Sequence, residues 1–144
     1  MHTVSFRKVG AYLGRDVRLG QLPIVGEVEQ LSADVVMLIP LKDVSEEIAK
    51  AELHALLKQE PLALMVAGPM AEVLFDAMLR LLNDGQDRPH TMTWISRYSD
   101  IPSAIEEFLY AVLPADTRWD DWTGYVVFAG AEWTDTVRTA VSTR

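Results

Sequence analysis

The sequence predicts one α/β domain of residues 1–144, in which helices cover both faces of a mostly parallel sheet of at least four strands and so form three layers. From Ala33 onward, short apolar runs typical of buried strands alternate with amphipathic segments at helical spacing, which is the pattern of βαβ units. The length of 144 residues suits a single domain. Apolar residues make up 49% of the chain, so a core can form without disulfides or metals.

The first 32 residues are predicted as a β-rich N-terminal extension. Short apolar pieces alternate there with turn residues such as Gly10, Gly14, Gly20 and Pro23. We expect one or two short strands and then a long connection. The predicted core spans 33–130, with four strands and three helices, and residues 131–144 form a C-terminal tail.

The first half of the core contains two continuous apolar runs, 35–39 and 62–67. Such runs are typical of parallel strands that are buried on both faces, so the first of them is predicted to be central. A helix is expected between them, with Asp43 and Glu46 as its capping box and an end near residue 59. After the second run, apolar residues recur at helical spacing from Met70 to Leu81, which predicts the second helix.

The second half of the core begins with a β-rich run at 91–95. A helix should then start at Ser99 and Asp100, because such side chains cap helices and Pro102 suits the first turn. Pro114 ends that helix, residues 115–124 are predicted as a loop, and 125–129 form the fourth strand. The tail is compatible with a short docked helix or with an edge strand.

Three segments of this core carry a family resemblance. They are 35–39, 62–68 and 91–95 with the acidic amphipathic helix that follows it. The run from Val35 to Gly130 resembles a family of small uncharacterised bacterial α/β domains. The resemblance implies a Rossmann-like fold and no established activity, so the expected architecture is a three-layer Rossmann-like or flavodoxin-like sandwich.

Composition and charge exclude several classes of function. The net charge is −8 and the chain is acidic overall, which is opposite to what nucleic-acid phosphates or anionic lipids attract, so neither partner is expected. The absence of cysteine excludes thiol nucleophiles and Cys-ligated metals. No apolar run approaches the roughly 18 residues of a membrane span, and we expect a cytoplasmic location.

Catalytic and cofactor motifs give no positive signal. The Gly-x-Gly-x-x-Gly and Walker A patterns are both missing from the sequence. The three histidines, His2, His54 and His90, lie in segments that predict surface positions, and none belongs to a zinc-binding pattern. We therefore predict no catalytic residue, no metal site and no cofactor.

The carboxyl ends of the parallel strands are the expected place for a ligand. Gly68 and Pro69 follow one strand, and Ser96, Arg97 and Tyr98 follow the next. Free amides at the Gly68 turn could meet an anion beside Arg97. The competing interpretation, which we favour, is a tight turn between strand and helix.

The loop at 115–124 has the most unusual local composition, since two tryptophans stand among three aspartates. Tryptophan is enriched at protein interfaces, and neighbouring carboxylates could meet a basic partner. In the competing interpretation, both indoles fold inward over the sheet edge and the carboxylates are only solvated. The candidate partner-binding residues are Asp116, Trp119, Asp120, Asp121 and Trp122.

Two helices are predicted to present acidic outer faces, formed by Glu46, Glu47 and Glu52 and by Glu106 and Glu107. Such faces steer association with basic proteins. The leading hypothesis is a non-catalytic, acidic protein-binding domain, for example a bacterial immunity or inhibitor protein for a basic toxin or effector. The alternative is a small enzyme or ligand-sensing domain that uses the strand-end crevice. A homodimer formed through the aromatic C-terminal region fits either hypothesis.

Overall fold

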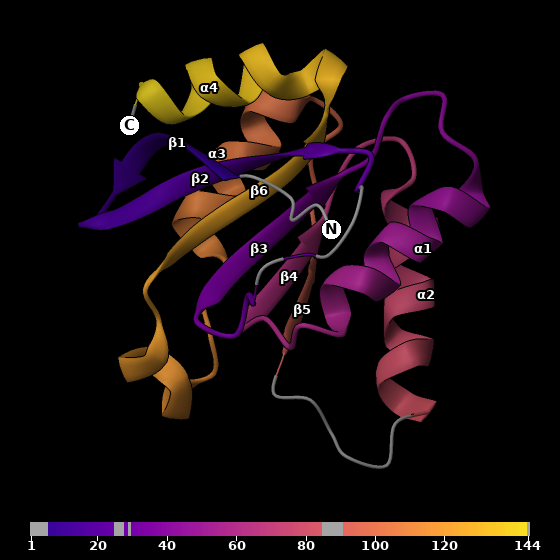
Figure 1. The fold of residues 1–144 in the computed structure, drawn as a ribbon, viewed down its shortest axis with the longest axis horizontal. Coiled ribbons are helices and arrows are strands. Elements are labelled where there is room, and N and C mark those ends of the chain that lie inside the picture. Colours follow the sequence, from indigo (N-terminus) through magenta and orange to yellow (C-terminus); the bar gives the residue numbers. More distant parts are fainter. Residues whose placement is uncertain (1–5, 25–27, 29, 85–90, 144) are drawn as a thin grey trace.

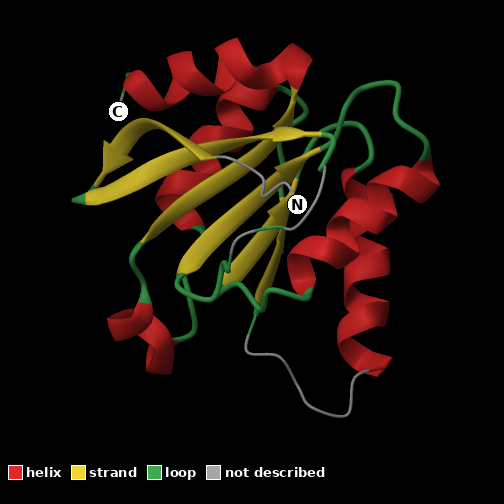
Figure 2. Ribbon diagram, viewed as in Figure 1, coloured by secondary structure: helices red, strands yellow, loops and turns green. Residues whose placement is uncertain are grey.

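The computed structural model describes residues 6–24, 28, 30–84 and 91–143, although the side chains of residues 83 and 84 are not described. Within these ranges the chain forms a six-stranded sheet with helices on both faces (Figures 1 and 2). The strands are β1 (Phe6–Tyr12), β2 (Arg15–Leu22), β3 (Asp34–Ile39), β4 (Ala63–Val66), β5 (Met92–Ile95) and β6 (Gly124–Gly130). The α-helices are α1 (Glu46–Leu57), α2 (Ala71–Asp84), α3 (Ile101–Ala111) and α4 (Thr134–Ser142), and the short 3-10 helices are η1 (Asp116–Asp121) and η2 (Ala131–Trp133).

The strand order is β1-β2-β6-β3-β4-β5, and only β1 runs antiparallel to its neighbour. This arrangement confirms the predicted α/β class and the mostly parallel sheet. The N-terminal extension contributes both of its strands to that same sheet rather than forming a separate layer. Because β6 pairs with β2 and β3, the last strand of the chain lies between its second and third.

Each face of the sheet has its own apolar core. Alternate residues of β3 point to opposite faces, so that Val35, Met37 and Ile39 join one core while Val36 and Leu38 join the other. The first core lies under α3 and α4, and the second lies under α1 and α2. This double coverage explains why the central strands are apolar at nearly every position, the exception being the buried Asp34 at the start of β3.

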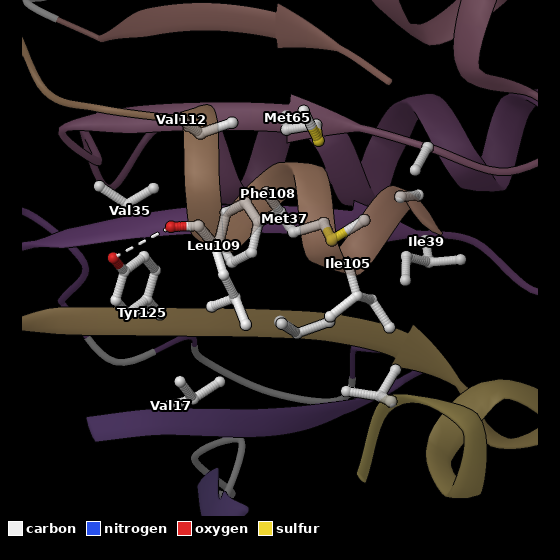
Figure 3. Close-up of a cluster of buried hydrophobic side chains, with 14 of the residues drawn as sticks. Val17, Val35, Met37, Ile39, Met65, Ile105, Phe108, Leu109, Val112 and Tyr125 are labelled. Atoms are coloured by element: carbon white, nitrogen blue, oxygen red, sulfur yellow. Dashed lines mark hydrogen bonds between the residues drawn. The ribbon is translucent and has the colours of Figure 1, made fainter. Parts of the chain in front are cut away.

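Tyr125 anchors the core under α3 (Figure 3). Its ring lies 5.6 Å from the ring of Phe108, and its hydroxyl lies 3.5 Å from the carbonyl oxygen of Leu109. Burial raises the pKa of Tyr125 to about 12, so the phenol is neutral at physiological pH. The packing fixes the last turns of α3 against the start of β6.

The beginnings of the helices only partly follow the sequence prediction. Asp100 caps α3 as expected, since its carboxylate accepts a hydrogen bond from the amide of Ser103 at 2.9 Å. The prediction that Asp43 caps α1 is wrong, because Ser45 Oγ accepts from the amide of Ile48 at 3.2 Å. A turn closed by the amide of Val44 takes up residues 41–44, so the helix begins after it.

The C-terminal tail is a docked helix, which resolves the two alternatives for that segment. On α4, Val137, Ala140 and Val141 are buried against the same core as α3. Apolar residues three and four positions apart form one face of a helix, whereas a strand would have turned Ala140 and Val141 to opposite faces. No helix in the described ranges is both long and apolar enough to cross a membrane.

The predicted acidic outer faces are wrong at two positions. Glu52 is only 6% exposed, on the inner side of α1, and Glu107 is largely buried beside the end of β5. Hydrogen bonds replace water for these carboxylates: Glu52 Oε2 accepts from the amide of Ile24 at 3.4 Å, and Glu107 binds Arg97. Glu46, Glu47 and Glu106 are exposed as expected.

Glu52 is a source of pH-dependent stability. Burial raises the pKa of its carboxyl, the Ile24 amide opposes that rise in part, and Oε1 has no hydrogen-bond partner among the described residues. A raised pKa means that the folded chain holds the proton to higher pH than the unfolded chain does. The contribution of Glu52 to folding stability is therefore present at acid pH and falls as the pH rises through the raised pKa.

We predict that Glu52→Gln raises the free energy of unfolding at neutral pH, because an amide avoids the cost of a buried charge. The gain should disappear toward about pH 4, where the wild-type carboxyl is protonated. Urea unfolding at several pH values measures both effects. Glu47→Gln, an exposed change on the same helix, is the control and should have little effect. Equal behaviour of the two variants would contradict the prediction.

Candidate functional site

The loop between α3 and β6 contains the strongest candidate site, and its two tryptophans have different environments. Trp122 is 7% exposed and packs on Tyr125, with ring centroids 5.4 Å apart. Its indole nitrogen donates to the carbonyl of Gly124 at 3.0 Å. The inward interpretation is therefore correct for Trp122, which closes the amino end of β6.

Trp119 lies on the outer side of this cluster. It is 40% exposed, and its ring meets that of Trp122 edge to face at 5.2 Å. The 3-10 helix η1 brings them together, because residues three apart are stacked on the same side of such a helix. Trp119 therefore packs against Trp122 on one side and is exposed to solvent on the other.

Three aspartates share the short helix η1 with Trp119. Asp116 and Asp120 are exposed, and neither has a partner among the described residues. Asp121 differs, since its carboxylate accepts a hydrogen bond from Arg118 Nε at 2.8 Å. We call Asp116, Trp119 and Asp120 the Trp119 surface. Trp122 packs beneath Trp119, and Asp121, whose side chain is also exposed, pairs with Arg118.

Arg15 is a residue of this region that the sequence analysis missed. Its guanidinium carbon lies 3.8 Å from the Trp122 ring centroid, and its Nε is 3.5 Å from the Trp122 carbonyl oxygen. Cations stack on indole faces in this way, which holds the ring and the β2 strand together. The two residues are 107 positions apart in sequence, and no local pattern links them.

The predicted strand-end crevice is divided between the two faces of the sheet. The β4 and β5 ends do lie side by side, because the amide of Ser96 donates to the carbonyl of Val66 at 3.0 Å. Gly68 and Pro69, however, lead into α2 on one face, while Arg97 and Tyr98 lead toward α3 on the other.

The Gly68 turn has the geometry of a tight strand-to-helix connection. Gly68 adopts φ +91°, a conformation that favours glycine, and its carbonyl accepts from the amide of Ala71 at 3.1 Å. Pro69 has no N–H group to offer. The amide of Ala71 is thus already hydrogen-bonded, and Pro69 has no amide hydrogen, so neither is free to bind an anion. Both features support the tight-turn interpretation.

Ser96 and Arg97 both hold the carboxylate of Glu107. The backbone amide of Arg97 donates to one carboxylate oxygen at 3.1 Å, and its Nε donates to the other at 2.8 Å. Burial raises the pKa of Glu107, but hydrogen bonds from Arg97 and Ser96 outweigh it, and the net pKa is lowered. The sequence analysis had treated Glu107 as a solvated surface charge.

At the carboxyl ends of β3 and β6, the segments that follow the two strands lead to opposite faces of the sheet. Residues of these segments fill the space between the two strand ends. The Leu41 side chain lies so close to Gly130 that a Cβ there would come within 2.6 Å of it. The amide of Lys42 donates to Glu132, and the Trp133 indole donates to the carbonyl of Pro40 at 3.1 Å. Ligands of parallel sheets commonly enter at this point, but these contacts close it here.

A groove of about 640 Å³ lies between α1 and α2, and His54 is among its exposed lining residues. His2 and His90 lie outside the described residues. Across the described ranges, no group of three or more His, Asp and Glu side chains is placed to hold a metal ion.

Comparisons of the chain with protein-family models, curated proteins and solved structures give no match.

The two tryptophans should respond very differently to truncation. We predict that Trp122→Ala lowers the free energy of unfolding by about 3–5 kcal/mol, because it leaves a cavity above Tyr125. Trp119→Ala should cost about 1 kcal/mol, the value of one exposed aromatic pair. Chemical denaturation measures both. A large loss for Trp119→Ala would mean that Trp119 is mainly a core residue.

Proposed function

We propose that this chain is a non-catalytic protein-binding domain that meets a basic partner through the Trp119 surface. The observation that carries the proposal is the environment of Trp119, an open indole supported by Trp122 and flanked by two exposed carboxylates. Tryptophans with this combination of rigidity and exposure are the usual anchors of protein interfaces.

The aromatic cluster beneath Trp119 favours binding because it restricts the indole in advance. Trp119 rests on Trp122, Trp122 rests on Tyr125, and Tyr125 rests on Phe108, each in edge-to-face geometry. A side chain that is already restricted loses little conformational entropy when a partner covers it. Flexible surface residues lack this advantage.

Charge favours a basic partner over an acidic one. Asp116 and Asp120 lie on the same short helix η1 as the exposed Trp119, and a lysine or arginine can make carboxylate and cation–π contacts with side chains of these kinds. The net charge of −8 increases the rate of encounter with a basic protein at low salt. An immunity or inhibitor protein for a basic toxin or effector is the specific form of the proposal.

The finer fold assignment is part of the same proposal. We assign a Rossmann-like arrangement because helices cover both faces of a parallel sheet. In such folds small ligands bind at the carboxyl ends of the strands, whereas the Trp119 surface lies at the amino end of β6. The proposed partner therefore leaves the usual ligand position untouched.

Affinity purification from the native lysate tests the proposal, with the tagged wild type compared against folded Trp119→Ala and Asp116→Asn/Asp120→Asn variants. We expect a basic protein to be captured by the wild type, about ten-fold less by either variant, and less as salt increases. The matched control is Glu46→Gln/Glu47→Gln, which removes the same two charges from α1.

Two outcomes would count against the proposal. Capture that survives both changes at the Trp119 surface would place the interface elsewhere. Equal losses for the Asp116→Asn/Asp120→Asn variant and the α1 control would show that binding depends only on total charge. Trp122→Ala is unsuitable for this test because it removes a core side chain.

A further inference from the structure

The outer edge of β5 is a second surface with unused hydrogen-bonding capacity. Among the described residues, this strand is last in the sheet and pairs only with β4. The amide of Met92 donates to the carbonyl of Leu62, directly before β4, and the amide of Ser96 donates to that of Val66 at the end of β4, both at 3.0 Å. Alternate residues of a parallel strand bond to the same neighbour, so Thr93 and Ile95 direct their backbone groups away from β4.

A groove of about 350 Å³ lies on the flank of α3, next to the segment that directly follows β5. Its lining residues are Arg97, Tyr98, Ser103, Glu106, Glu107, Tyr110 and Ala111. The opposite flank of α3 packs against α4, and Glu107 on the groove flank contacts Arg97 directly after β5. The groove flank of α3 therefore faces toward the free edge of the sheet.

The length of the groove matches an extended peptide. Helix α3 connects two parallel strands and so runs in the opposite direction, which places Tyr98 near one end of the groove and Tyr110 near the other. The eight helical residues from Ser103 to Tyr110 span roughly 10 Å, about the length of three residues in a strand. A peptide paired with Thr93 and Ile95 would direct alternate side chains toward this groove.

Arg97 gives the groove a preference for one chemical group. Its backbone amide and Nε both donate to Glu107, its guanidinium carbon lies 5.9 Å from the Tyr98 ring centroid, and the side chain remains 77% exposed. A guanidinium held in this way can receive a carboxylate with little loss of conformational freedom. Glu106 in the same groove disfavours a peptide that is acidic throughout.

The exposed tyrosines supply the apolar contact. Tyr110 is 80% exposed and Tyr98 is also exposed, and their rings stand at the rim of the groove. Tyrosine at such positions provides contact area at low entropic cost, as in many binding sites. We infer that the β5 edge binds an extended peptide of a partner protein, with an apolar side chain against Tyr110 at one end of the groove and a carboxylate at Arg97, beside Tyr98, at the other.

This inference is independent of the Trp119 surface. Strand addition supplies affinity through the backbone groups of Thr93 and Ile95, and the groove supplies selectivity. A second copy of the chain is the competing occupant, since an exposed edge can pair with itself. The net charge of −8 on each copy opposes that pairing and favours a different partner.

A random peptide library displayed on phage, selected against the immobilised wild type, provides the probes. Selected peptides are then synthesised, and their affinities for variants are measured by fluorescence polarisation. Thr93→Pro removes the outward N–H without touching the β4 bonds, and we expect it to weaken binding by about ten-fold. Thr93→Val keeps that N–H and should bind like the wild type.

Two further variants locate the peptide. Arg97→Lys keeps the charge but loses the planar fork, so it should weaken peptides that contain a carboxylate and leave their amide analogues unaffected. Trp119→Ala should have no effect, and a loss of peptide binding in that variant would overturn the inference. Failure to enrich any peptide, or equal affinity of Thr93→Pro and wild type, would also overturn it.

Two measurements keep the test conclusive if the proline variant is unstable. Hydrogen exchange of the Thr93 and Ile95 amides should slow in the wild type when a selected peptide binds, and unchanged exchange would contradict edge pairing. Sedimentation of the peptide-free protein should show a monomer. A dimer that Thr93→Pro dissociates would identify a second copy, rather than a peptide, as the occupant.

Discussion

The rest of the structure depends on the pairing of β6 along both of its edges. All seven residues of this strand are buried, and it joins β2 on one side to β3 on the other. Without β6 the N-terminal hairpin would lose its connection to the core strands. Because β6 lies late in the sequence, its pairings with β2 and β3 join residues that are far apart along the chain. The chain must close long loops to make them. The aromatic cluster on Tyr125 fixes the point where β6 begins.

Helix α3 connects this core to both proposed surfaces. Its inner side packs Phe108 against Tyr125, and the chain leaving its C-terminus forms η1 with Trp119. Its outer flank carries Glu107, which orients Arg97 beside the β5 edge. The two surfaces are therefore supported by the same rigid element, and an exposed side chain on a rigid element binds with less entropic loss than one on a loose loop.

Much of the fold could be predicted because local patterns determine it. The apolar runs of β3 and β4 report burial on both faces, and Asp100 with Pro102 marks the start of α3 through local capping chemistry. Contacts between residues far apart along the chain, in contrast, leave no recognisable pattern in the local sequence. Arg15 stacks on Trp122 across 107 positions, Leu41 fills the space above Gly130, and Glu52 faces inward beneath the N-terminal connection. The candidate aspartates and Trp119 could be identified from the local composition of the sequence. That Trp119 is exposed while Trp122 is buried follows only from the geometry of η1.

The charge of the chain bears on how an open sheet edge can be tolerated. An unpaired strand invites association with any other strand, and proteins limit this with short strands and with charge. Strand β5 has only four residues, and each copy of the chain carries a net charge of −8. Repulsion between copies acts over the Debye length of about 8 Å at physiological salt, which is enough to oppose close edge-to-edge contact. The same charge has little effect on a short peptide with a single carboxylate, because Arg97 lies at the groove itself. Under the two proposals, acidity discourages self-association at β5 and would attract the proposed basic partner to the Trp119 surface.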